Sequence, residues 1–539
     1  MADSAYTRTV PSVRTRTFYS NLVVVRIERY NIIRMKAITV LFCGRLCDEA
    51  FESVFEGKNS VTLALEQAKK FPSSEKTVLL APLGNYPFPG GVQIEQKDWA
   101  KRNLLEKIAE LQQGYDCVYF AFADCPFLDP ALAGTLSERH IRERADYSYA
   151  DGFPYGLAPE ILAPGTAGVL AKILGDNDGP VERDMLFSVI QKDINAFDIE
   201  AEISAVDLRC HRINLCADSK RNLLLLKNFI AAAGKVPCAG DVEKIVQEKP
   251  EILRTLPAFY PIQVYGGCPA ACKICPYPKF TDAVGRKDFM DAARFASLLD
   301  KIVSFSGDAV IDLSLWGELS LHPEKMKLIE EVVSRGALAL VIETSGIGWK
   351  EQELEECARI CSDLSKNTAR KNALPPLSWI VSFNMENGGY GFAEAENCAQ
   401  KLLSLFPKDC YVQAVRIKGF EEETEKFYRR WKETNVIIQK YDDFCGALEK
   451  KQASDISPVV RKPCWHIMRD MPVLLDGSAP LCREDLSTLK QQGGRILGNV
   501  FSDSLENIWK VGDSYYREQC CKNYSGLCKE CDEYYTFNF

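Results

Sequence analysis

The sequence predicts an α/β protein with an N-terminal open α/β sheet domain, a central partial (β/α)6 parallel barrel and a small C-terminal cysteine-rich metal-binding domain. Two long stretches of the chain alternate short apolar segments with longer amphipathic ones, as strands and helices do in parallel sheets. The last stretch, 463–539, is short and holds six of the 21 cysteines. A bound metal is therefore expected to replace part of its core.

The composition is that of a globular chain that does not bind polyanions. With 539 residues, of which 46% are hydrophobic and 26% charged, the chain has room for several domains. Its formal net charge is −8 at pH 7, whereas a general nucleic-acid-binding surface needs clustered Lys and Arg. We expect no nucleic-acid partner.

The cysteines are expected to be reduced. The sequence shows no signal peptide pattern, and a chain of this length is unlike the short secreted domains that disulfides hold together. No apolar run approaches the roughly 20 residues of a membrane helix. We therefore expect a cytoplasmic protein with no membrane partner, in which closely spaced cysteines bind metal or carry out redox chemistry.

The first domain is expected over 35–234. Residues 1–34 carry six Arg against two acidic residues, and Met35 directly precedes a strand-like run, so 1–34 is expected to be a disordered or artefactual extension. The expected strands are Ile38–Phe42, Thr77–Ala81 and Cys117–Ala121, and the expected helices are Ser60–Lys70 and Leu104–Gln113. Gly and Pro at the edges of 235–258 predict a linker there.

The second alternating series predicts the barrel over 259–450. Its expected strands are Ile262–Tyr265, Val310–Leu315, Leu338–Ile342, Trp379–Phe383, Val412–Arg416 and Val436–Lys440. Its expected helices are Asp288–Phe305, Glu324–Arg335, Glu351–Leu364, Ala393–Leu405 and Glu422–Thr434. In such a barrel, reactive groups gather at the carboxyl ends of the strands.

Three cysteines follow the first expected barrel strand. Cys268, Cys272 and Cys275 lie within eight residues on a loop rich in Gly and Pro. Iron–sulfur clusters normally take four cysteines, so three leave one iron open to a substrate or cofactor. The alternative is a zinc loop, which would need a nearby fourth ligand, and the next histidine is His322.

The Cys-x3-Cys-x2-Cys spacing at the end of a first barrel strand resembles the signature loop of the radical SAM superfamily. The resemblance covers about 261–448. It implies that Cys268, Cys272 and Cys275 hold a [4Fe–4S] cluster whose open iron is chelated by S-adenosylmethionine. Reductive cleavage would then release a 5′-deoxyadenosyl radical, with electrons from a donor such as flavodoxin or ferredoxin.

Further motifs lie where this resemblance places cofactor contacts. Trp316-Gly317-Glu318 is similar to the Gly-Gly-Glu element that receives the SAM ammonium, with Trp replacing its first Gly. Relatives usually have an aromatic residue at the position of Ile274, where the contact is largely through the backbone. The cofactor-binding residues that the resemblance implies are Ile274, Gly317, Glu318, Ser382, Asn384, Arg416, Ile417 and Gly419.

Four cysteines of the segment 460–539 form a second predicted metal site. Cys464 and Cys482 flank a hairpin signal at Asp476-Gly477, and Cys528 and Cys531 form a terminal CxxC. By spacing alone, such a set suits a zinc ribbon equally well. The order of these features resembles the SPASM extension of some radical SAM enzymes, which implies one auxiliary [4Fe–4S] cluster and leaves Cys520 and Cys521 as spares.

Two aspartates of the first domain form a weaker motif. Asp124 follows an expected strand, and Asp151 begins a later Gly- and Pro-containing loop. They resemble the strand-end aspartate and sugar-side loop of nucleotidyltransferases of the glycosyltransferase-A type, which implies a site for Mg²⁺ and nucleotide phosphates. The early phosphate loop lacks most of its glycines, so we favour a degenerate domain that binds a partner or a sugar-like ligand.

Together these motifs predict a radical SAM enzyme that acts on an unknown peptide, protein or sugar-related substrate. One alternative is a nucleotidyltransferase that acts on a sugar phosphate and carries a metal-stabilised accessory region. The other is a non-catalytic zinc scaffold.

Overall fold

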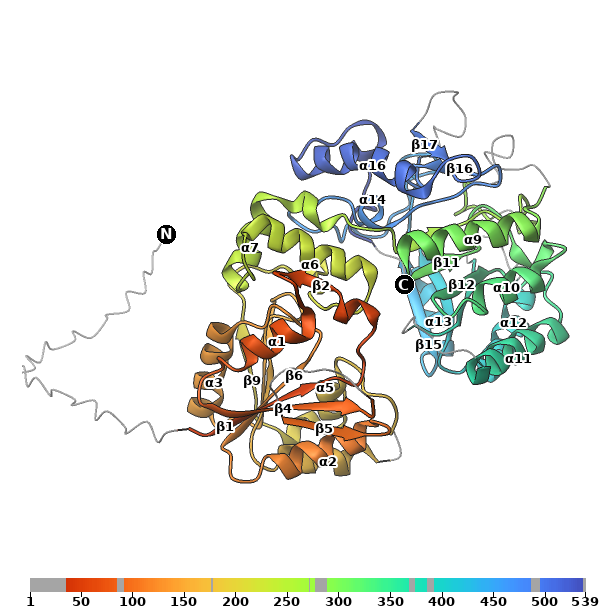
Figure 1. Ribbon diagram of the computed structural model, residues 1–539. Coiled ribbons are helices and arrows are strands. Elements are labelled where there is room, and N and C mark those ends of the chain that lie inside the picture. The colour runs from red at the N-terminus through yellow and green to blue at the C-terminus, as the bar shows by residue number, and fades with distance from the viewer. Residues whose placement is uncertain are drawn as a thin grey trace, which may run out of the picture.

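The computed structural model describes residues 35–84, 92–175, 178–270, 272–276, 288–367, 374–384, 392–485 and 495–536. In Figure 1 the N-terminal domain and the barrel lie side by side, and the C-terminal segment lies across both of them. The predicted α/β fold class is confirmed.

The N-terminal domain is built on a seven-stranded sheet with the order β5-β4-β1-β6-β8-β7-β9. β8 is antiparallel to β6 and β7, and the other neighbouring strands are parallel. The strands are β1 (Ala37–Phe42), β4 (Ser74–Pro82), β5 (Val92–Gln96), β6 (Cys117–Phe122), β7 (Tyr147–Asp151), β8 (Glu160–Leu162) and β9 (Ile199–Ile203). Every residue of β1 and β6 is buried, which explains why both strands are continuous apolar runs in the sequence.

Helices and one small hairpin complete this domain. The helices are α1 (Ser60–Ala68), α2 (Lys101–Leu111), α3 (Pro130–Glu143), α4 (Thr166–Leu174), α5 (Met185–Ile190), α6 (Lys220–Ala233) and α7 (Ala239–Glu248), and the hairpin pairs β2 (Ser53–Phe55) with β3 (Lys58–Asn59). The segment 235–258, which the sequence predicts as a linker, therefore contains a helix. Val242, Ile245 and Val246 of α7 are part of the domain's core, so this helix is an integral part of the domain.

The barrel is a six-stranded parallel sheet with the order β10-β11-β12-β13-β14-β15. Its strands are β10 (Phe259–Pro261), β11 (Ala309–Asp312), β12 (Leu338–Thr344), β13 (Leu377–Phe383), β14 (Cys410–Arg416) and β15 (Asn435–Lys440). Its helices are α9 (Ala292–Ser306), α10 (Lys325–Val333), α11 (Glu351–Asn367), α12 (Phe392–Leu405) and α13 (Glu421–Trp431). Among the described residues β10 and β15 are edge strands, so the barrel is open, as predicted.

The first barrel strand begins earlier than the sequence predicts. β10 ends at Pro261, whereas the apolar alternation predicts a strand over Ile262–Tyr265. The backbone of that later segment bonds in two directions, since Ile262 donates to the Asp312 carbonyl at 2.7 Å and Gln263 donates to the Val473 carbonyl at 2.8 Å. The C-terminal segment thus extends the sheet beside β10.

The C-terminal segment contributes side chains to the cores of both other domains. It contains α14 (Trp465–Arg469), β16 (Ser478–Pro480), β17 (Ile496–Asn499) and α16 (Leu505–Cys520). The predicted turn at Asp476-Gly477 is present, and Leu474 before it donates to the Ser478 carbonyl at 2.8 Å, but the strand ladder of β16 forms with β17. Ile467 and Met468 pack in the N-terminal core, whereas Val473 and Ile508 pack in the barrel core.

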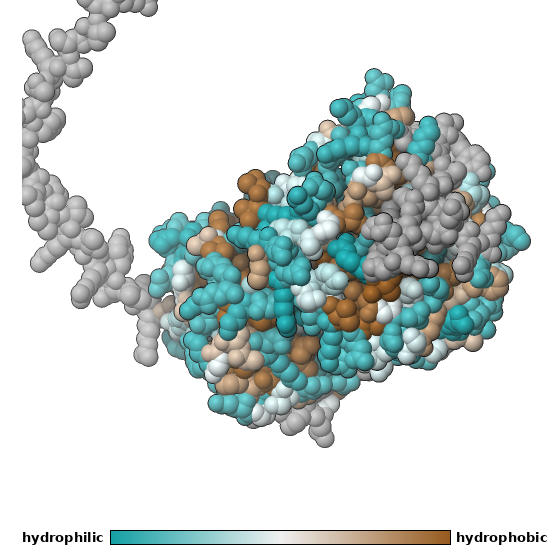
Figure 2. Space-filling view, turned by 90° about the horizontal axis from the view of Figure 1, so that it is seen from above, coloured by the Kyte–Doolittle hydropathy of each residue, from teal (hydrophilic) through white to brown (hydrophobic). Residues whose placement is uncertain are grey.

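No described helix combines the length and apolar character that crossing a membrane requires. On the face seen in Figure 2, hydrophilic residues predominate and hydrophobic residues gather in smaller patches between them.

Candidate active site

A cavity of about 280 Å³ opens at the carboxyl ends of the barrel strands. The predicted cofactor residues that line it are Cys268, Cys272, Ile274, Cys275, Gly317, Glu318 and Ser382. The first four come from the loop after β10, the next two from the loop after β11, and Ser382 from β13. Residues far apart in the chain therefore converge, as the carboxyl ends of adjacent parallel strands require.

The cysteine loop holds its thiols in a low-dielectric environment. Burial raises the pKa of the Cys268 thiol to about 11, and the nearby Glu318 carboxylate contributes to that rise. Burial also raises the pKa of Cys272, which a hydrogen bond with the Asn384 side chain opposes. Asn384, one of the predicted cofactor-binding residues, thus lies beside Cys272. A bound metal deprotonates such thiols outright, so metal binding here would release protons.

The side chain of Glu318 lines the cavity and is held in place by hydrogen bonds. Its side chain is 3% exposed. One carboxylate oxygen accepts from the Thr344 hydroxyl at 2.5 Å, and the other accepts from the Ser345 amide at 3.0 Å and the Ser345 hydroxyl at 2.7 Å. Burial raises the pKa of Glu318, and these hydrogen bonds oppose the rise. A carboxylate fixed in this way is suited to accept hydrogen bonds from an ammonium group.

Gly317 is required where two loops cross. A side chain at this position would place its Cβ 1.9 Å from the carbonyl oxygen of Tyr265, on the strand side of the cysteine loop. The Glu318 amide donates to the Gly267 carbonyl at 2.8 Å, which ties the same two loops together. Trp316 has a φ of 51°, a left-handed conformation that favours the glycine found there in the resembling family.

We expect Gly317→Ala to reduce 5′-deoxyadenosine formation from SAM by about 100-fold. The added methyl group must push the cysteine loop away from Glu318, and a displacement of about 1 Å in a reaction site costs that much. The measurement is kcat/KM for SAM in anaerobic protein. The matched control is Gly240→Ala in α7, where a Cβ would have nothing within 4 Å. Equal activity of the two variants would contradict the expectation, drawn from the sequence resemblance, that SAM binds in this cavity.

Of the remaining predicted cofactor residues, Ser382 joins a polar network that lines the cavity, whereas Arg416, Ile417 and Gly419 do not line it. Ser382 donates to Glu343 at 2.9 Å, and Gln413 donates to the same carboxylate oxygen at 2.8 Å, so the strands β12, β13 and β14 share one polar network. Arg416, Ile417 and Gly419 follow at the end of β14. Arg416 and Gly419 are exposed, Ile417 is buried, and the part of β14 that lines the cavity is Val415.

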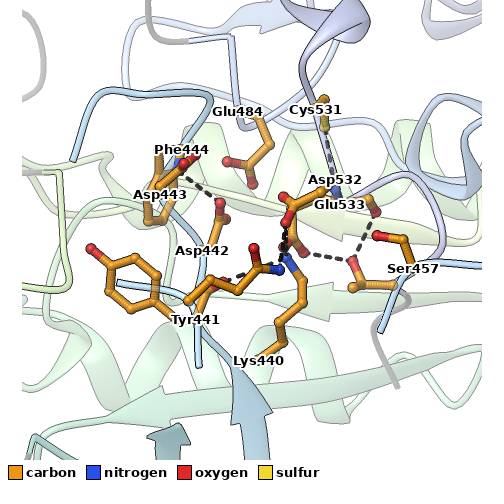
Figure 3. A network of polar contacts seen from close by, with 12 residues as sticks. Lys440, Tyr441, Asp442, Asp443, Phe444, Ser457, Glu484, Cys531, Asp532 and Glu533 are labelled. Carbon is orange, nitrogen blue, oxygen red and sulfur yellow. Dashed lines mark hydrogen bonds and ion pairs between the residues drawn. The ribbon is translucent and has the colours of Figure 1, made fainter. Parts of the chain in front are cut away.

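The opposite wall of the cavity is charged, which the sequence does not predict. Lys440 at the end of β15, Asp442, Arg483 and Glu533 line it. Figure 3 shows the Lys440 ammonium directed at the carboxylates of Asp532, at 3.0 Å, and Glu533. The side chain of Lys440 is 7% exposed. This ion pair joins the last barrel strand to the residues that directly follow Cys531.

A second, smaller cavity collects the four predicted auxiliary cysteines. Cys464, Cys482, Cys528 and Cys531 all line it, together with Cys445. A hydrogen bond between Cys445 and Cys531 lowers the pKa of Cys531. Cys445 has no closely spaced cysteine partner in the sequence. The sequence signal that could have marked this position is Gly446, the glycine directly after Cys445. In the structure Phe444, Cys445 and Gly446 form a turn with left-handed φ angles of 51°, 54° and 82°, a conformation that glycine favours.

The two cavities share one wall. Three short segments, 442–445, 482–484 and 531–533, each contribute residues to both. Within one of them, Arg483 lines the larger cavity while Cys482 and Glu484 line the smaller. A group bound by the auxiliary cysteines would therefore lie directly behind the charged wall of the barrel cavity.

The two aspartates that the sequence singles out in the N-terminal domain each pair with a different arginine, and Asp124 also lies within 4.8 Å of the potential ligands Cys125 and Cys216. Asp124 is buried, and its two oxygens accept from the two terminal nitrogens of Arg183 at 3.1 Å and 2.5 Å. Arg183 also donates to Asp218 at 2.9 Å. Asp151 instead faces the exposed Arg209 at 3.4 Å. Because a guanidinium lies where Mg²⁺ would have to bind, Asp124 does not fit the predicted magnesium site.

Several solved structures are similar to parts of the chain, and no family model matches it. A cytidylyltransferase from Leptospira borgpetersenii shares 16% identity, with a TM-score of 0.35, over 41% of this chain and 97% of its own. BtrN in complex with AdoMet and 2-DOIA shares 17%, with a TM-score of 0.34, over 52% and 94%. SuiB from Streptococcus suis, bound to the precursor peptide SuiA, shares 14%, with a TM-score of 0.38, over 54% and 75%.

Two proteins of Treponema pallidum (strain Nichols) are similar in sequence, and both are described as uncharacterized. One shares 37% identity over 68 residues, which are 13% of this chain and 31% of its own length. The other shares 34% identity over 373 residues, which are 66% of this chain and 98% of its own length. The chain therefore belongs to the same family as this second Treponema pallidum protein.

Proposed function

We propose that this protein is a radical SAM enzyme that uses an auxiliary iron–sulfur cluster to modify a peptide, protein or sugar-related substrate. The observation that carries this proposal is the barrel cavity, where Cys268, Cys272 and Cys275 lie opposite the fixed carboxylate of Glu318. Three thiol ligands with no fourth protein ligand in the motif suit a [4Fe–4S] cluster that leaves one iron for SAM.

The residues of the chain would have distinct roles. The three cysteines would hold the cluster, which when bound supplies the electron that breaks a carbon–sulfur bond of SAM. Glu318 would accept hydrogen bonds from the SAM ammonium group. Ser382 and Asn384 would orient the polar end of SAM, and Trp316, which is 8% exposed, would keep water from the reacting atoms.

Four cysteines in the second cavity suit an iron–sulfur cluster or zinc by number, and the resemblance to the SPASM extension favours the cluster. An iron–sulfur cluster bound here would relay electrons or hold substrate next to the shared wall.

The proposal is tested by anaerobic reconstitution of the full-length protein with iron and sulfide. We expect about seven to eight irons per chain and formation of 5′-deoxyadenosine when SAM and a strong reductant are added. An electron donor such as flavodoxin or ferredoxin should replace the chemical reductant. Iron-loaded protein that forms no 5′-deoxyadenosine would overturn the proposal. Zinc without iron or sulfide would support the scaffold alternative, and pyrophosphate release from a nucleoside triphosphate would support the nucleotidyltransferase alternative.

A further inference from the structure

A third cavity, of about 310 Å³, lies where all three parts of the chain meet. Arg45, Arg183 and Arg221 line it from the N-terminal domain, Phe259 and Asp308 from the barrel, and Trp465 and Arg469 from the C-terminal segment. None of these residues belongs to the proposed cofactor site. The cavity is in the size range of small-molecule sites, which are often found between domains.

Four arginines and three aspartates line this cavity, and most of them pair with one another or with a neighbouring side chain. Arg183 is neutralised by Asp124 and Asp218, and Arg221 by Asp308 at 3.1 Å. The carboxylate of Asp470, which also lines the cavity, faces His466 at 2.6 Å. The aspartates of the lining are therefore already engaged. Within the described part of the chain, Arg45 and Arg469 have no carboxylate within ion-pair distance.

Arg469 is the most informative of these residues. Its Nε atom is buried with no hydrogen-bond partner, and its guanidinium lies 5.0 Å from the centre of the Trp465 ring. Burial lowers the pKa of Arg469 to about 9, and the neighbouring Arg221 contributes to that shift. Asp470 and Asp308 attract this cation without forming an ion pair with it, so its buried Nε donor remains available to an anionic ligand.

We propose that this cavity binds a small phosphate-bearing organic molecule, with the phosphate between Arg469 and Arg45. Guanidinium groups match the geometry of phosphate oxygens and can bind them in pairs. Arg45 follows the end of β1, and ligands of open α/β sheets bind outside the carboxyl ends of their strands. The ring of Trp465, beside Arg469, offers an apolar surface for the organic part of the ligand.

The test is isothermal titration of the full-length protein with glucose 1-phosphate, inorganic phosphate and glucose. We expect both phosphates to bind and glucose not to bind. Arg469→Gln should weaken phosphate binding at least tenfold, and Arg45→Gln, at an exposed position, should weaken it severalfold. Arg209→Gln is the matched control, because this exposed arginine pairs with Asp207 away from the cavity.

A second readout separates ligand binding from a structural role. We expect Arg469→Met to melt at the same temperature as the wild-type protein or higher when no ligand is present, and to lose the stabilisation that phosphate gives the wild type. Absence of phosphate binding by the wild type, or equal binding by the Arg469 and Arg209 variants, would overturn the proposal. If the Arg469 variants do not fold, equal binding by Arg45→Gln and wild type would overturn it instead. Formation of 5′-deoxyadenosine, measured separately, reports on the proposed function and not on this site.

Discussion

Replacing Cys268, Cys272 and Cys275 together with alanine should abolish 5′-deoxyadenosine formation and remove about four irons per chain. All three thiols line the barrel cavity, and the reaction requires an iron to which SAM can bind. About four irons should remain, because the auxiliary cysteines lie in a separate cavity. The measurements are iron and sulfide content, and product formation under strong reductant.

The control for the triple variant is Cys521→Ser. Cys521 is exposed at the end of α16, outside both cysteine cavities. This variant should keep the full iron content and activity. Retention of 5′-deoxyadenosine formation by the triple variant would contradict the assignment of the cluster to these three cysteines.

Cys464→Ser should remove the other four irons, leave SAM binding in the barrel intact and destabilise the C-terminal segment. Cys464 is 7% exposed and lies within the N-terminal core, so its cluster would link that core to the shared wall. Structural metal sites contribute directly to folding free energy. The measurements are iron content, SAM affinity and the thermal transition of the reconstituted protein.

Cys445→Ser is the matched variant for this prediction. Cys445 lines the same cavity and contacts Cys531, but the other four cysteines would complete the proposed cluster without it. We expect its iron content to equal that of the wild type. If Cys445→Ser loses the auxiliary iron and Cys464→Ser keeps it, the four ligands include Cys445 in place of Cys464.

Much of the fold can be predicted from the sequence because strands buried on both faces are visible as apolar runs. The predicted strands Thr77–Ala81 and Trp379–Phe383 lie inside observed β4 and β13. The first barrel strand is less predictable, because Gln263 bonds to Val473, which is more than 200 residues further along the chain. A pairing of that kind leaves no local signal.

The candidate site, like the fold, can be predicted from the sequence only in part. Cys268, Glu318 and Ser382 each follow or end an expected strand, so their convergence follows from the parallel topology. Lys440 lies at the end of the expected strand Val436–Lys440, but its partners and Arg483 reach the cavity only because the C-terminal segment folds back on β15. Cys445 carries no spacing pattern that would indicate its place in the second cavity. Asp124 matches a metal-binding motif in sequence, but its partner Arg183 is 59 residues away.

The sequence by itself determined the three-part α/β organisation and the two sets of closely spaced cysteines, because periodicity and short-range spacing are local properties of the chain. Only the tertiary structure decided which polar groups meet: it paired Asp124 with Arg183, brought the two cysteine cavities to a common wall, and left the Nε atom of Arg469 buried without a hydrogen-bond partner. These outcomes depend on contacts between segments far apart in the chain, where the low dielectric of the interior makes each pairing, or its absence, energetically significant.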